Sequence, residues 1–177
     1  SRRPSVVEVG VGVGVAGLGG DQLAVPAERL LRRPLLRLVV EVDQAEALEI
    51  NLSLETDLPP QPFASLLARF ASNRVTVNYD TGNSAALGFD PAEELACYGD
   101  RLSDIHIKDR ILGGSSVALG TGNTLFDRFF DALRPISYQG PFIMQAYRDD
   151  EGTTVFRSQL MWISQRLSPW IGGVVGA

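Results

Sequence analysis

Short strand-like segments alternate with longer amphipathic segments between residues 48 and 167. The expected strands, in which apolar or β-branched residues dominate or alternate, are residues 48–55, 74–80, 102–107 and 142–145. Apolar residues recur at helical spacing in residues 63–70, 90–98, 124–133 and 153–167. Strands that alternate with helices form a parallel sheet with right-handed crossovers. We therefore predict an α/β fold of about four βα units with parallel strands.

The length of the chain limits how far such a fold can close. A complete (β/α)8 barrel takes about 200 residues or more, whereas this chain has 177, and residues 1–47 are too few for four further units. We predict a partial (β/α)8 TIM barrel, with a half-barrel domain at residues 48–177. We also predict that residues 1–47 form an irregular N-terminal segment, made of a glycine-rich strand or turn and a helix.

An open half-barrel leaves two sheet edges and an apolar inner face exposed. We therefore expect residues 1–47 to cover the opening, or a second copy of the chain to cover it in a homo-oligomer.

Charge and cysteine content exclude several classes of function. The net charge is −5, which argues against a nucleic-acid surface and against an anionic membrane as partners. No apolar run approaches the roughly 18 to 20 residues of a membrane span. The single cysteine, Cys97, excludes an internal disulfide and a thiolate zinc site. These features lead us to expect a cytoplasmic protein.

Each of the four predicted strands ends in a residue that can bind a metal. These residues are Glu55, Asp80, His106, which is the single histidine, and Gln145. The carboxyl ends of parallel strands lie at one edge of the sheet, so the four side chains can converge. Two carboxylates, an imidazole and an amide oxygen suit Mn²⁺, Mg²⁺ or Co²⁺. Individually, each residue also has an ordinary structural role, such as the capping of its own loop by Asp80.

A second motif indicates a different class of protein. Gly12, Gly14 and Gly17 match the spacing of a dinucleotide-binding fingerprint after an apolar run. The helix that this motif requires would contain Pro26 in its interior, which costs about 3 kcal/mol. Because the whole stretch is rich in glycine, a chance match is the simpler interpretation. A nucleotide-dependent oxidoreductase remains an alternative that NADH binding would test.

Several short motifs together resemble the sugar phosphate isomerase/epimerase family of xylose isomerase-like TIM barrels. They are Leu-Ser-Leu-Glu-Thr-Asp at 52–57, Asn-Tyr-Asp-Thr-Gly-Asn at 78–83, Asp-Ile-His-Ile-Lys-Asp-Arg at 104–110 and Leu-Gly-Thr-Gly at 119–122. The resemblance covers about residues 48–167 and corresponds to the C-terminal half of that barrel. It implies one divalent metal, commonly Mn²⁺, held by a Glu, an Asp, a His and a second Glu.

By this resemblance Glu55, Asp80 and His106 are metal ligands, and Gln145 occupies the position of the last glutamate. The implied reaction is the isomerisation or epimerisation of a small-molecule sugar or sugar phosphate, by proton abstraction next to a carbonyl, with Glu55 as the base. The candidate substrate-binding residues are Asn83, Lys108, Arg110 and Arg148.

Two departures from the family pattern favour an alternative function. Gln145 can offer a carbonyl oxygen to a metal but cannot accept a proton, so Glu55 is the one remaining candidate base. The first half of the barrel is also not recognisable. The alternative is a non-catalytic sugar-binding protein or an inactive remnant of the same fold. DNA-repair endonucleases share this barrel, but their three-zinc site needs several histidines, and this chain has one.

Overall fold

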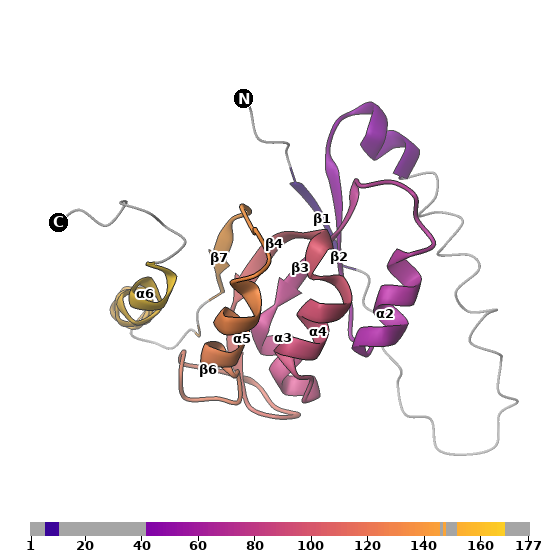
Figure 1. Ribbon diagram of the computed structural model, residues 1–177. Helices are drawn as coiled ribbons and strands as arrows, with labels where there is room; N and C mark the ends of the chain where they lie inside the picture. The colour runs from indigo at the N-terminus through magenta and orange to yellow at the C-terminus, as the bar shows by residue number, and fades with distance from the viewer. Residues whose placement is uncertain (1–5, 11–41, 146, 148–151, 169–177) are drawn as a thin grey trace, which may run out of the picture.

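The computed structural model describes residues 6–10, 42–145, 147 and 152–168 (Figure 1). Its main feature is a five-stranded parallel sheet with the order β1-β2-β3-β4-β7. The strands are β1 (Val6–Gly10), β2 (Asn51–Glu55), β3 (Val75–Asp80), β4 (Leu102–Ile107) and β7 (Phe142–Met144). The predicted parallel α/β architecture is confirmed. The sheet gains a fifth strand because β1 lies within the segment predicted to be irregular and pairs with β2.

Helices follow the strands as the alternation predicts. They are α2 (Pro60–Leu67), α3 (Thr81–Leu87), α4 (Pro91–Tyr98), α5 (Phe126–Leu133) and α6 (Thr153–Leu167). A 3-10 turn (Gly99–Arg101) precedes β4, and a small antiparallel pair, β5 (Asp109–Arg110) and β6 (Ser116–Val117), follows it. The glycines of the fingerprint motif lie outside the described residues.

Helix α3 begins directly after Asp80, where the sequence indicated a loop. Asp80 caps this helix, since its Oδ1 accepts hydrogen bonds from the backbone N–H groups of Gly82 at 2.9 Å and Asn83 at 2.8 Å. Gly88 ends the helix in the left-handed conformation, with φ of 76°. The predicted capping by Asp80 is therefore present, and the segment that it caps is a helix.

One side of the sheet, the helix face, is apolar. Leu54, Val77 and Ile105 are buried there, and helices pack over this side (Figure 1). The ring of Tyr79 stacks on Phe129 of α5, with ring centroids 5.3 Å apart. This packing is the hydrophobic core of the domain, and it fixes the direction in which every strand presents its other face.

The opposite side of the sheet, the site face, is polar. Alternation along the strands places Ser53, Thr76, Asn78 and Asp104 there, together with the strand-end residues. Ser53 and Asp104 are each 1% exposed. The expectation of an exposed apolar inner face is therefore wrong, because hydroxyl, amide and carboxyl groups occupy these positions and are buried.

A search of the described residues for membrane-spanning helices finds none that is both long enough and apolar enough.

Candidate metal centre

Three potential metal ligands meet at the carboxyl ends of β2, β3 and β4. Glu55, Asp80 and His106 each offer one ligand atom, and these atoms all lie within 4.8 Å of one another. The sheet register explains this, because Asp80 and His106 are direct partners in the pairing of β3 with β4. Asp80 and His106 are buried, whereas Glu55 is half-buried. Opposite ligands of one divalent ion lie about 4 to 5 Å apart, so this spacing is close to that of a single site.

Gln145 joins the same cluster from the end of β7. Its backbone N–H donates to the carbonyl of Ile107 at 2.9 Å, which continues the strand pairing. Its side-chain Nε2 lies 2.7 Å from Nδ1 of His106, and its Oε1 accepts from Lys108 Nζ at 3.5 Å. A half-turn of the amide would direct its oxygen to the cluster.

Glu55 is held by two amide side chains. Asn78 Nδ2 donates to its Oε2 at 3.1 Å, and Asn83 Nδ2 donates to its Oε1. Burial and then the charge of Asp80 raise the pKa of Glu55, against the hydrogen bond from Asn83. A raised pKa means a higher affinity for a proton, which suits a general base.

The predicted substrate-binding residues differ in what they contact. Lys108 Nζ lies 3.5 Å from Asp80 Oδ2 and 3.4 Å from Asn83 Oδ1, so its charge borders the cluster. Arg110 donates to Asn83 Oδ1 at 2.9 Å and, through Nε and Nη2, to the carbonyl of Gly114 at 3.0 and 2.7 Å. Arg110 therefore binds protein groups on two sides of its guanidinium. Arg148 lies outside the described residues.

Asp109 has a structural role that the sequence reasoning missed. Its carboxylate accepts three backbone N–H bonds, from Gly120 and Gly122 at 2.9 Å and from Thr124 at 3.0 Å, and it is 1% exposed. These bonds hold the loop that follows β4 against the strand end. An acidic residue directly after a strand, followed by a Gly-x-Gly loop, was the signal available in the sequence.

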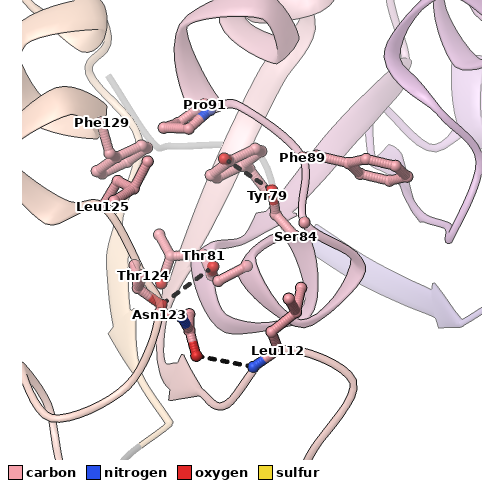
Figure 2. A pocket seen from close by; sticks show the side chains of 12 residues that line it. Tyr79, Thr81, Ser84, Phe89, Pro91, Leu112, Asn123, Thr124, Leu125 and Phe129 are labelled. Atoms are coloured by element: carbon pink, nitrogen blue, oxygen red, sulfur yellow. Dashed lines mark hydrogen bonds between the residues drawn. The ribbon is translucent and has the colours of Figure 1, made fainter.

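Two cavities lie at different distances from this centre. The larger, of about 910 Å³, is lined by Lys108 and Gln145, among others, and so adjoins the cluster. The smaller, of about 250 Å³, lies beside α3, α4 and α5 (Figure 2). Neither cavity is lined by Glu55, Asp80 or His106. Polar groups at the smaller cavity already have partners. Tyr79 donates to Glu94 at 2.8 Å. Asn123 accepts from Leu112 N–H at 2.8 Å, a contact drawn in Figure 2.

A family model described as xylose isomerase-like TIM barrel matches residues 26–166. The chain belongs to this family. The resemblance to sugar phosphate isomerases and epimerases is thereby confirmed, as is the partial TIM barrel. The match begins within residues 1–47, so part of that segment belongs to the family's domain.

Relatives and solved structures agree with the assignment to the xylose isomerase-like family. SgbU of Escherichia coli (strain K12), whose name assigns it provisionally as an L-ribulose-5-phosphate 3-epimerase, is 28% identical over 142 residues, which are 71% of this chain and 49% of SgbU. The chain thus spans about half the length of this relative.

Two solved structures share the fold of this xylose isomerase-like chain. A xylose isomerase domain protein from Planctomyces limnophilus has a TM-score of 0.69 at 21% identity, and the match covers 92% of this chain and 60% of that protein. A xylose isomerase-like TIM barrel protein from Mycobacterium smegmatis, in complex with magnesium, has a TM-score of 0.62 at 22% identity, with 93% and 61% covered.

Proposed function

We propose that this chain is the metal-binding half of an enzyme that isomerises or epimerises a sugar or a sugar phosphate. The observation that carries the proposal is the convergence of Glu55, Asp80 and His106, whose ligand atoms lie within 4.8 Å of one another. Membership of the xylose isomerase-like family and the name of the relative SgbU support the same class of substrate.

The donor set fits a divalent cation. Two carboxylate oxygens and one imidazole nitrogen suit Mn²⁺, with Mg²⁺ and Co²⁺ as alternatives, and Gln145 is placed to add an amide oxygen. The magnesium complex of the Mycobacterium smegmatis protein supports a hard cation in this fold. A bound ion would polarise the carbonyl and hydroxyl oxygens of the substrate.

Glu55 would remove the proton next to the substrate carbonyl. Asn78 and Asn83 hold both of its oxygens, and its raised pKa increases its affinity for the proton. Gln145, at the end of β7, cannot accept a proton. The described part of this chain therefore supplies one candidate base, which would move a proton between neighbouring carbons on one face of the substrate, as isomerisation requires. Epimerisation would need a second proton donor on the opposite face.

Substrate would enter the cavity of about 910 Å³ that adjoins Lys108 and Gln145. Lys108 would attract a phosphate or a carbonyl oxygen, while Asn83 would bind a hydroxyl group. Arg110, and Arg148 outside the described residues, are further candidates for an anionic group. The presence of Gln145 favours a second candidate function, a non-catalytic sugar-binding protein.

The first experiment is Mn²⁺ binding by calorimetry, on the wild-type chain and on His106→Ala. We expect saturable binding that the variant loses. A folded wild-type chain that binds no Mn²⁺ would contradict the metal centre.

The second experiment separates catalysis from binding. The chain is incubated in D₂O with L-ribulose 5-phosphate and with the unphosphorylated ketose, and NMR follows deuterium entering next to the carbonyl. We expect exchange that requires Mn²⁺ and disappears in Glu55→Gln. Binding of Mn²⁺ without any exchange would favour the sugar-binding alternative.

A further inference from the structure

Asp104 is a buried carboxylate that the proposed reaction does not use. It lies on β4, two residues before His106 and on the same site face, and it is 1% exposed. Its Oδ1 accepts hydrogen bonds from Ser53 Oγ at 2.8 Å and from Ser103 Oγ. Its Oδ2 has no hydrogen-bond donor within the described part of the chain. Nε2 of His106 lies 4.0 Å from this oxygen.

The two nitrogens of His106 face different surroundings. Nδ1 lies 2.7 Å from Gln145 Nε2 and 3.3 Å from Asn78 Nδ2, on the side of the candidate metal ligands. Both neighbours are amide nitrogens, which donate hydrogen bonds, so Nδ1 acts as the acceptor. Nε2 then carries the proton and faces Asp104 Oδ2. A neutral imidazole binds a metal through the nitrogen that has no proton.

We propose that Asp104 is a positioning residue that keeps the proton of His106 on Nε2, so that Nδ1 presents its lone pair to a divalent cation. The proposal rests on the proposed metal centre for the identity of the ligand at Nδ1. A shift of about 1 Å brings Nε2 and Oδ2 within hydrogen-bond distance. Carboxylates that accept from the far nitrogen of a metal-bound histidine fix both its tautomer and its ring orientation.

The serine contacts of Asp104 explain why its free oxygen points to His106. Ser53 comes from β2 and Ser103 from β4, and their hydroxyl groups are also 2.8 Å from each other. Together they hold Oδ1, so the second oxygen is fixed in direction before any metal binds. The arrangement is built from two strands, β2 and β4, and does not depend on a loop.

The single histidine makes the test direct. Long-range ¹⁵N–¹H NMR of the metal-free chain at about pH 8 reports which nitrogen of His106 carries the proton. We expect the Nε2–H form in the wild type. In Asp104→Asn the amide oxygen keeps the serine hydrogen bonds and the NH₂ group faces Nε2, so the Nδ1–H form should increase. Mn²⁺ affinity should fall about 10- to 100-fold.

Two control variants separate this role from general damage to the face. Thr76→Val removes a buried hydroxyl on the same face that has no hydrogen-bond partner among the described residues, and it should alter neither the tautomer nor Mn²⁺ affinity. Glu8→Gln tests a second carboxylate, because Glu8 is the register partner of Ser53 on β1. We expect the Nε2–H form to persist in Glu8→Gln.

Three results would overturn the proposal: an Nδ1–H form in the wild type, an unchanged tautomer in folded Asp104→Asn, or a switch caused by Glu8→Gln and not by Asp104→Asn. The wild-type spectrum tests the predicted Nε2–H form even if Asp104→Asn does not fold. The tautomer is read without metal, so a wild-type chain that keeps Nε2–H and binds no Mn²⁺ contradicts the proposed function alone.

Discussion

Gln145 is the residue whose chemistry most limits the proposed reaction. Its amide lies 2.7 Å from His106 Nδ1 and 3.5 Å from Lys108 Nζ, so a carboxylate in its place would face both the candidate metal and a cation. We predict that Gln145→Glu raises Mn²⁺ affinity roughly tenfold, because the charge of the ligands tunes affinity. Calorimetry measures this, with Gln165→Glu as the control for added charge on an exposed helix position. Equal gains in both variants would show that net charge alone acts.

The same residues show what the sequence could and could not reveal at this scale. The convergence of Glu55, Asp80 and His106 could be predicted because each ends a strand, and the ends of parallel strands lie together. Asp104 was not found, because its role depends on Ser53, which lies 51 positions away in the sequence. Contacts across three strands follow from register, and register cannot be read from alternation alone.

At the scale of elements, the loop after β4 depends on Asp109. The three backbone N–H bonds that its carboxylate accepts are buried and charge-assisted. Asp109→Asn replaces one accepting oxygen with a donor, so we predict a loss of about 1.5–3 kcal/mol in the free energy of unfolding. Urea denaturation measures the loss, and hydrogen exchange should show faster opening of residues 113–124. The exposed Asp131, changed to Asn, is the matched control. Equal stability of the two variants would refute the role given to Asp109.

A second element-scale contact joins α3, α4 and β3 through Glu94. Its carboxylate accepts from Tyr79 and Tyr98 at 2.8 Å each and from Ser84, and it is 3% exposed. Burial raises its pKa above the ordinary 4.5, in spite of these hydrogen bonds.

The pKa of Glu94 gives a prediction about pH. A carboxyl group with a raised pKa binds more protons in the folded state, so its contribution lowers the free energy of unfolding as pH rises above 4.5 through the raised pKa. Glu94→Gln should remove this pH-dependent contribution. As pH rises across that range, the free energy of unfolding of the variant should therefore increase relative to that of the wild type. Urea denaturation from about pH 4 to pH 7.5 measures the difference. A difference that is constant with pH would contradict the role of Glu94.

At the scale of the whole molecule, the sequence predicted the parallel sheet, because alternating strands and helices leave few other topologies. It predicted a glycine-rich strand or turn within residues 1–47 but not a place for it in the sheet, which comes from the pairing of β1 with β2. It also misjudged the inner face, where Thr76, Asn78 and Asp104 are polar and buried. In the sequence these residues alternate with apolar core residues, which is the ordinary pattern of a strand with one exposed face. Their burial is seen only in the assembled sheet.

The edges of the five-stranded sheet, β1 and β7, lead to the last prediction, which concerns association. On β7, Ile143 is 38% exposed, and Phe156 and Leu160, one helical turn apart on α6, are 46% and 44% exposed. An edge strand beside exposed apolar side chains is prone to pair with another chain. We predict that the 19.2 kDa chain forms a homo-oligomer through this region. Light scattering coupled to gel filtration should give a mass of at least two chains.

The variant Phe156→Lys/Leu160→Glu should return that mass to one chain, because charged groups would have to be buried without partners at the contact. Met161→Lys, at a 68% exposed position on the same helix, tests whether any new charge on α6 has this effect. Phe156 also lines the cavity beside Lys108 and Gln145, so a partner seated on this region would narrow the entrance to the proposed metal centre. A wild-type chain that stays monomeric at every concentration would show that the β7 edge and α6 do not need a second copy.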